Sequence, residues 1–349
     1  MKKTLAIVLA LVLCLSLAAC GGGSSSGGSG SAPAGETLTL KLTHCQADGH
    51  PIDEGADLMA KLVEERTNGR VKIDVYPANM LGAESVTRDM VKEGTVDIVL
   101  LGSAANNYNK AMNLAMSFYL IQSIPECDYM LFESDFAKKY MHQDFEANHN
   151  VVYLDSWSQS SRQTMTTKPF RTPEDLKSIK LRVPAGIPVW ETAWNRMGAM
   201  TVSMGLDDAF SGLQQGVCDG VEGPIDQMYF YSFQEIAKNY ITTNHCFYSY
   251  QFLMNKDSYN KLTDEEKKIL SECSAEAKKL HDQLRDENVT KLVDDMVKSA
   301  GVTVIDLTAA ERQAFADLAN QAIQESMSDW GEECYNDFMT EVEAWRKAN

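Results

Sequence analysis

Residues Lys177–Pro224 read KSIKLRVPAGIPVWETAWNRMGAMTVSMGLDDAFSGLQQGVCDGVEGP, and in them short apolar runs alternate with segments of helical periodicity. The apolar runs predict strands at 179–183, 200–204 and 217–222. The periodic segments predict helices over 189–197 and 207–215, each followed by a glycine. Strands and helices in this order predict an α/β sheet, which binds ligands at the carboxyl ends of its strands. Arg182 lies near that end of the first strand, two residues before Pro184.

The chain that precedes this stretch follows the same α/β pattern. Alternating apolar residues predict strands at 38–43 and 71–76, and the apolar run that follows Asp97 predicts a third strand at 97–101. Helical periodicity fills both intervals between these strands. Because a helix between successive strands favours parallel pairing, we expect a second α/β domain in this half of the chain.

A helix that is long for a globular protein follows the two α/β regions. Thr263 and Glu266 form a capping box at its start, and apolar residues recur at helical spacing to about Ser299. Strands expected within 240–255 lead back to the first domain, so each domain consists of two segments. The predicted division assigns residues 36–158 plus 248–290 to domain I and residues 159–247 plus 291–349 to domain II.

The first 35 residues have the composition of an export signal and a tether. A short basic start precedes an apolar run from Leu5 to Leu17, which is typical of a signal peptide over residues 1–19. The run ends in a Leu-Ala-Ala-Cys sequence that resembles a bacterial lipobox, which implies cleavage before Cys20 and a lipid on its sulfur. Residues 20–35 are mostly Gly and Ser, as in a flexible tether. We expect a lipid-anchored protein on the outer side of the cytoplasmic membrane, in the periplasm or at the cell surface.

The charge and the cysteines restrict the partners of the protein. The formal net charge is −17, and without a basic stripe to offset it this charge excludes nucleic acid as a partner. An anionic ligand would need a local cationic pocket. Six cysteines follow Cys20, at positions 45, 127, 218, 246, 273 and 334, and none has CxxC spacing. Buried thiols are expected, and a disulfide in an exported protein stays open.

Several motifs resemble those of one family. LRVP at 181–184 and LQQGVCDGVEGP at 213–224 are similar to the signature of the DctP-type solute-binding proteins of tripartite TRAP transporters. The likeness extends from Leu38 to about Ala344. It implies a two-domain, periplasmic-binding-protein-like (type II) α/β fold, in which the long helix bridges both domains. In that family the arginine of the LR-x-P strand pairs with the carboxylate of the ligand, so the resemblance assigns this role to Arg182.

A second arginine occurs in WSQSSR, residues 157–162. This segment is similar to the one in which the family's chain first crosses to the second domain, and it often carries an arginine near the ligand. Arg162 matches that arginine. A guanidinium group suits the role because it is planar, always charged and able to bind a carboxylate through two hydrogen bonds. The alternative for both arginines is an ordinary salt bridge.

The resemblance implies further ligand contacts from both domains. The candidate residues are Glu84, His50, Ser103, Trp157, Trp190, Leu206 and Gly223. Gly223 replaces an asparagine that commonly donates to the ligand in the family, so we expect a lost donor and gained space. Leu206 stands where sialate-binding members carry an aromatic residue, which argues against sialate. Trp157 and Trp190 could stack on a sugar ring, although tryptophans are core residues by default.

Catalysis finds no support in the sequence. Glu222 could be a general acid, but it has no evident second carboxylate or nucleophile at a defined spacing. Phosphate loops, serine elbows and metalloprotease helices have no counterpart in the sequence. We expect no cofactor and no metal, because the cluster of His44, Cys45, His50, Asp53 and Glu54 matches no known metal site.

The sequence therefore predicts a receptor, not an enzyme, that binds a small organic acid and delivers it to TRAP membrane subunits for ion-coupled uptake. A sugar acid is the favoured ligand, and a C4-dicarboxylate, an aromatic acid or another organic acid is the alternative. Two other classes of protein stay open: a secreted hydrolase or lyase that acts on sugar acids, and a receptor that presents its ligand to a sensor.

Overall fold

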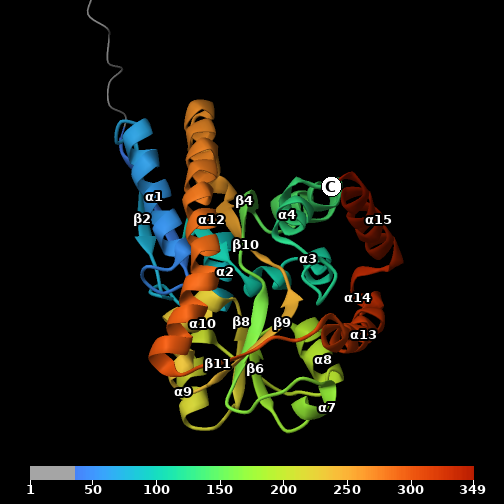
Figure 1. Cartoon of the computed structure of the whole chain (residues 1–349). Coiled ribbons are helices and arrows are strands. Elements are labelled where there is room, and N and C mark those ends of the chain that lie inside the picture. Colours follow the sequence, from blue (N-terminus) through green and yellow to red (C-terminus); the bar gives the residue numbers. More distant parts are fainter. Residues whose placement is uncertain (1–35) are drawn as a thin grey trace, which may run out of the picture. The chain divides into compact units, whose positions relative to one another are not determined.

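The computed structural model describes residues 36–349, and their strands form two sheets (Figure 1). The strands of the first sheet, in spatial order, are β2 (Val71–Tyr76), β1 (Leu38–His44), β3 (Ile98–Leu101), β10 (Ser249–Asn255) and β4 (Val151–Ser158). β1 is parallel to β2 and β3, whereas β10 is antiparallel to β3 and β4. The parallel start agrees with the prediction, because a helix between two strands returns the chain to the edge at which it began.

The second sheet contains the unit predicted within residues 177–224. Its strands, in spatial order, are β11 (Thr303–Ile305), β9 (Asn239–Cys246), β5 (Arg162–Thr166), β8 (Gly220–Gly223), β6 (Lys180–Pro184) and β7 (Met200–Met204). β6 lies between β7 and β8 and is parallel to both. β8 starts later than predicted, because the amides of Val217 and Cys218 still donate to Gly212 O at the end of α9 (Leu206–Gln214).

The segment between β3 and β4 is a series of short helices. Its short helices are η1 (Ser103–Asn107), α3 (Lys110–Ala115), α4 (Ile124–Asp128), η2 (Tyr129–Glu133), α5 (Asp135–Ala137), η3 (Lys138–His142) and α6 (Gln143–Asn148). Ser134 makes one of the breaks. Its backbone is extended, and its hydroxyl accepts a hydrogen bond from Ala137 N at 2.9 Å, so that it starts a new helix instead of continuing the old one.

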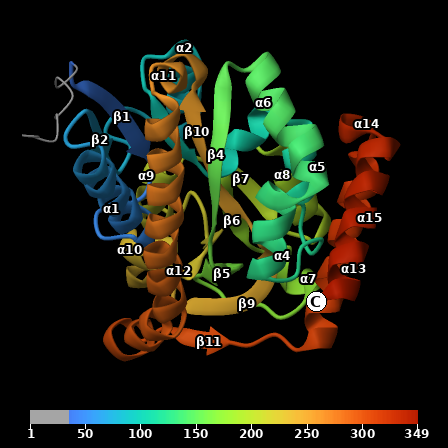
Figure 2. The same ribbon diagram turned by 90° about the horizontal axis from the view of Figure 1, so that it is seen from above.

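Three connections join the lobes that form around the two sheets. The chain crosses between β4 and β5 and returns between β9 and β10. The third connection is α12 (Asp264–Ala300), a helix of 37 residues that begins at the predicted capping box of Thr263 and Glu266. It packs on α1 (Pro51–Arg66) and β4 beside the first sheet, and on α10 (Ile225–Phe230) and η4 (Phe233–Glu235) beside the second (Figure 2). The predicted bridging helix is therefore present.

The C-terminal helices pack on both lobes. The remaining helices are α2 (Glu84–Glu93), α7 (Pro173–Leu176), α8 (Pro188–Arg196), α11 (Lys256–Asn260), α13 (Ala309–Glu325), α14 (Met327–Trp330) and α15 (Glu332–Ala348). α13 packs on α8 and β9, but α15 packs on α3, α4 and α5 of the first lobe. Phe338 meets the ring of Phe136 edge-on at 5.1 Å, and Arg346 Nε lies 2.7 Å from the buried Glu126 carboxylate. The predicted division placed residues 291–349 in domain II. Because of its contacts with α3, α4 and α5, α15 belongs instead to the first lobe.

The six cysteines of the described residues are all buried and free, as expected. Between residues 36 and 349, no helix combines the length and the apolar character needed to span a bilayer. The predicted signal peptide, the lipidated Cys20 and the tether lie outside the described residues.

Gly198 follows the last turn of α8, and its surroundings exclude a side chain. Its φ is +108°, and a Cβ would lie 2.5 Å from Pro173 O. We expect Gly198→Ala to lower the free energy of unfolding by roughly 3 kcal/mol in urea titrations. Gly216→Ala is the matched control, because Gly216 has φ +69° with no heavy atom within 4 Å, so backbone strain alone should cost about 1 kcal/mol. Equal losses in the two variants would contradict the steric argument.

Candidate functional site

A cavity of about 300 Å³ receives residues from both lobes. The second lobe contributes the carboxyl end of β6 and the loop that leads from β7 into α9, as expected for an α/β sheet. The first lobe contributes the start of α2 and the loop before it. Four of the predicted residues, Arg182, Arg162, Glu84 and Leu206, line this cavity.

Arg182 is held in the cavity wall by one backbone carbonyl. The residue is 3% exposed, and its Nε and Nη2 donate to Met204 O, at the end of β7, over 3.0 and 2.8 Å. It forms no ion pair with any described residue. Burial lowers its pKa, with an opposing contribution from Glu222, and a guanidinium group stays protonated at neutral pH. Arg182 therefore presents a positive charge that has no direct counter-ion.

Arg162, in contrast, is already paired. Its Nε and Nη2 each donate to the carboxylate of Glu222 at 2.6 Å, and the side chains are 2% and 0% exposed. Glu222 is supplied by β8, which pairs with β5. Burial alone would raise the pKa of Glu222, but Arg162 and His245 hold it at about 2. The pair stays ionised, and Arg162 adds little net charge to the cavity.

His245, from β9, completes this buried network. Its Nε2 lies 3.0 Å from Glu222 Oε2, and its Nδ1 lies 2.9 Å from Thr243 Oγ1. Burial lowers the pKa of His245 despite the neighbouring carboxylate. The neutral ring therefore donates through Nε2 to Glu222 and accepts through Nδ1 from the threonine hydroxyl.

Trp190 acts on the site through Arg162. The Arg162 guanidinium contacts the rings of both Trp190 and Tyr248, and its central carbon lies 4.8 and 4.7 Å from their centroids. The indole of Trp190 is buried and donates to Met116 O at 2.8 Å. Arg162 lies over the Trp190 ring, which is too deeply buried to stack on a ligand as the sequence suggested. This cation–π contact instead stabilises the position of the arginine.

Glu84 begins α2 and brings a carboxyl group into the cavity wall. One of its oxygens accepts a hydrogen bond from Gly102 N. Burial raises the pKa of Glu84, and the Gly102 bond and the positive charges of Arg162 and Arg182 partly offset that rise. Such a group can accept hydrogen bonds from the hydroxyl groups of a ligand.

Two predicted residues, Trp157 and His50, lie away from the cavity wall, and the side chain of a third, Ser103, is not described. Trp157 is fully buried and donates from its indole to Asp155 at 3.2 Å. His50 is also fully buried, and its Nδ1 caps α1 by accepting from Ile52 N at 3.1 Å. Ser103 begins η1, and its side chain lies outside the described part of the structure. Trp157 and His50 thus have packing and capping roles in place of the expected ligand contacts.

Gly223 does not leave an empty space, which corrects the expectation from the sequence. A Cβ at this position would lie 2.7 Å from Gln227 Oε1, and Gln227 lines the cavity. A side chain from α10 therefore occupies the space beside Gly223 and brings an amide group with it.

Other cavity residues escaped the sequence analysis. They are Asn79, Arg88, Asp207, Gln227, Tyr248 and Tyr250, among others. Asn79 Nδ2 lies 3.5 Å from Asp207 Oδ1, so that this contact connects the two lobes. Arg88 follows Glu84 by one helical turn, and this spacing could have indicated it. The two tyrosines lie at the return crossing, where no motif marks them.

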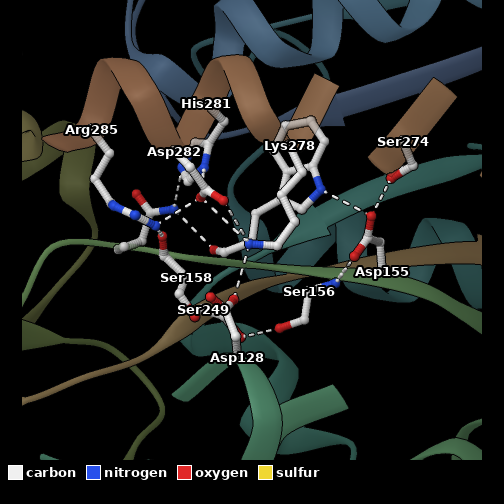
Figure 3. Close-up of polar contacts among 12 residues, drawn as sticks. Asp128, Asp155, Ser156, Ser158, Ser249, Ser274, Lys278, His281, Asp282 and Arg285 are labelled. Atoms are coloured by element: carbon white, nitrogen blue, oxygen red, sulfur yellow. Dashed lines mark hydrogen bonds and ion pairs between the residues drawn. The ribbon is translucent and has the colours of Figure 1, made fainter. Parts of the chain in front are cut away.

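Side chains of α12 hold the first crossing between the lobes (Figure 3). Arg285 Nη1 donates to Ser158 O, at the end of β4, over 2.7 Å, and pairs with Asp282 at 2.8 Å. His281 Nε2 lies 3.0 Å from the amide nitrogen of Gln159 in the crossing segment. The bridging helix therefore fixes the point at which the chain leaves the first sheet.

The group of possible metal ligands near the end of β1 is engaged in other contacts. His44 Nε2 lies 3.3 Å from Asp53 Oδ1, and Cys45 Sγ lies 3.3 Å from the hydroxyl of Tyr250. Among residues 36–349, no three His, Cys, Asp or Glu side chains are placed to hold a metal ion.

A buried carboxyl group, Asp226 on α10, faces His50 on α1. Asp226 Oδ2 and His50 Nε2 are 3.6 Å apart, and both side chains are fully buried. This separation is too long for a good hydrogen bond. Burial raises the pKa of Asp226 to about 6 and lowers that of His50 well below its ordinary value. The pair is therefore a neutral histidine beside a carboxyl group that ionises with difficulty.

The raised pKa of Asp226 makes stability depend on pH. The carboxyl group ionises near pH 3.8 in the unfolded chain and near pH 6 in the folded one, so the folded state loses up to roughly 3 kcal/mol as pH rises through 6. Asp226→Asn should raise the melting temperature at pH 8 and change it little at pH 4. Asp74→Asn, on the exposed side of β2, is the control and should shift stability by less than about 0.5 kcal/mol. Equal gains for Asp226→Asn at pH 4 and pH 8 would contradict this reasoning.

Comparisons with known proteins agree with this fold. The family model for bacterial extracellular solute-binding proteins, family 7 (DctP), matches residues 42–329. The chain is 25% identical over 302 residues to the C4-dicarboxylate-binding periplasmic protein DctP of Rhodobacter capsulatus, covering 81% of this chain and 84% of that protein. It is 28% identical over 296 residues to the 2,3-diketo-L-gulonate-binding periplasmic protein YiaO of Escherichia coli K12, covering 82% and 86%.

A solved structure shows the same fold. It is that of a TRAP periplasmic solute binding protein from Xanthobacter autotrophicus Py2 with bound β-D-galacturonate, with a TM-score of 0.78, 25% identity and coverage of 87% of this chain and 99% of that one. The two α/β lobes and the bridging helix are thus those of a periplasmic-binding-protein fold. The family model covers most of the chain and includes both sheets, so this protein belongs to family 7 of the bacterial extracellular solute-binding proteins, the DctP family.

Proposed function

We propose that this protein is the solute receptor of a TRAP transporter, which binds a small organic acid and delivers it to the membrane subunits. Arg182 carries the proposal. Its guanidinium is buried in the cavity wall and has no ion-pair partner among the described residues. A ligand carboxylate would supply the missing counter-charge through charge-assisted hydrogen bonds. Membership of a solute-binding family supports transport as the context.

The charges of the cavity favour a sugar acid over a C4-dicarboxylate. The residues Glu84 and Asp207 line the same cavity as Arg182 and bring two carboxyl groups to it. A second carboxylate on the ligand would be repelled by them, whereas sugar hydroxyls can donate to them. The relatives include both kinds, since one is named for a C4-dicarboxylate, another for 2,3-diketo-L-gulonate, and the Xanthobacter structure holds galacturonate. The preference for a sugar acid over a C4-dicarboxylate therefore rests on the residues of this cavity and not on the names of the relatives.

The hydrolase or lyase alternative loses its candidate acid in this geometry. Glu222 is bound by Arg162 and His245, is fully buried and has a pKa of about 2. A general acid must instead hold a proton near the working pH. A sensor receptor would use the same binding chemistry, and the presence or absence of transporter genes beside the gene of this protein would distinguish the two.

Binding of an organic acid should depend on Arg182. We expect galacturonate, galactonate or succinate to raise the melting temperature of the protein, and neutral galactose not to. Arg182→Met should weaken binding of the acid at least about tenfold in calorimetric titrations, because it removes the one arginine of the cavity lining that has no ion-pair partner among the described residues. The melting temperature of the ligand-free protein should not fall, since a buried unpaired charge is costly.

Arg196→Met is the matched control, because Arg196 forms an exposed ion pair with Glu325 on the outer side of α8. Its affinity for the acid should equal that of the wild type. Unchanged binding in Arg182→Met would refute the assigned role of the arginine, and a melting-temperature response to galactose alone would refute the carboxylate receptor.

We also propose that Cys20 carries a lipid that anchors the protein outside the cytoplasmic membrane. The lipobox-like sequence and the names of the periplasmic relatives support this location. Cells fed a labelled fatty acid should label the wild-type protein but not Cys20→Ser. Label retained in Cys20→Ser would contradict the assignment, and Cys45→Ser serves as a control for cysteine substitution.

A further inference from the structure

Gly223 and Gln227 share one space beside Arg162. Gly223 ends β8, and Gln227 is the third residue of α10. A Cβ on residue 223 would lie 2.7 Å from Gln227 Oε1 and 3.8 Å from Arg162 Nη2. A Cβ carbon and a non-bonded oxygen do not approach to 2.7 Å unless one of them is displaced. The absence of a side chain at 223 is therefore what allows the Gln227 amide to reach this part of the wall.

The Gln227 side chain is placed for a ligand. The residue is 6% exposed and lines the cavity with Arg162 and Arg182. Its backbone N–H donates to Asp226 Oδ1 at 3.0 Å, which steadies the turn. Its side-chain amide forms no hydrogen bond to another residue among those described, although every neighbouring arginine has partners. Neither polar atom of this amide is among the buried atoms that lack a partner, so both reach the cavity surface, where water or a ligand can satisfy them.

We propose that Gln227 is a specificity-determining residue that binds a hydroxyl group of the solute, and that Gly223 makes room for it. The amide donates through Nε2 and accepts through Oε1, and a hydroxyl group can satisfy both. A carboxylate could use only the donor. This inference rests on the proposed function, because it assumes that an organic acid occupies the cavity, and it narrows that acid to a hydroxy acid.

The test compares galactonate with its monodeoxy analogues in calorimetric titrations. Gln227→Met keeps the length of the side chain but removes both polar atoms. It should bind galactonate about tenfold more weakly than the wild type, and one monodeoxy analogue should bind both proteins with affinities within about threefold. Gln214→Met, on the exposed face of α9, is the matched control and should leave every affinity unchanged.

Gly223→Ala is an independent test, because it changes residue 223 and leaves Gln227, the other member of the contact, intact. Its methyl group should displace the Gln227 amide and weaken galactonate binding. In a Gln227→Ala background the collision is gone, so Gly223→Ala should then have little further effect. Additive losses in the double variant would contradict the shared space. Circular dichroism and melting temperature show whether each variant is folded.

Each remaining outcome decides between the two proposals. Equal loss for galactonate and all its analogues in Gln227→Met, or no loss at all, overturns the role of Gln227 and leaves the receptor standing. Wild-type binding of succinate but of no hydroxy acid also overturns this inference while supporting a carboxylate receptor. If the wild type binds no acid, and Arg182→Met accordingly changes nothing, the proposed function itself fails.

Discussion

The buried ion pair of Arg162 and Glu222 is the constraint on which the site depends. Two charges that leave water lose several kcal/mol of hydration each, roughly, so the pair is favourable only with good geometry and further partners. The second lobe supplies both: two short hydrogen bonds, His245 behind the carboxylate, and cation–π contacts of the guanidinium with the rings of Trp190 and Tyr248. Because β5, β8, β9 and the return crossing all contribute, the pair fixes how these segments meet.

The pairing of Arg162 leaves Arg182 as the electrostatic centre of the cavity. Two arginines of similar burial have different roles here, because one faces a carboxylate and the other faces the backbone carbonyl of Met204. A chain with a net charge of −17 repels anions at long range. The guanidinium of Arg182, which is nearly buried, offsets this repulsion locally, because charges interact more strongly where water is excluded.

The bridging helix α12 limits how the two lobes can move relative to each other. α12 packs on both lobes, and Arg285 and His281 hold the segment between β4 and β5. Asn79 and Asp207 meet from opposite lobes, as do His50 and Asp226. Closure of two lobes about a few such connecting segments is the usual motion of binding proteins of this kind. The polar contacts of α12 restrict where the chain can bend.

The sequence by itself determined the local structure and the central arginine. The period of apolar residues, the glycines after helices and the capping boxes predicted most strands, the long helix and the position of Arg182, because these signals act within a few residues. It did not predict the partner of Arg162, the burial of Trp157 and His50, the position of α15 or the side chain that fills the space at Gly223. Each of these is a contact between segments far apart in the chain, so only the tertiary structure decided them. A charge or a ring has the same appearance in sequence whether it faces a ligand or the core, and packing alone separates the two.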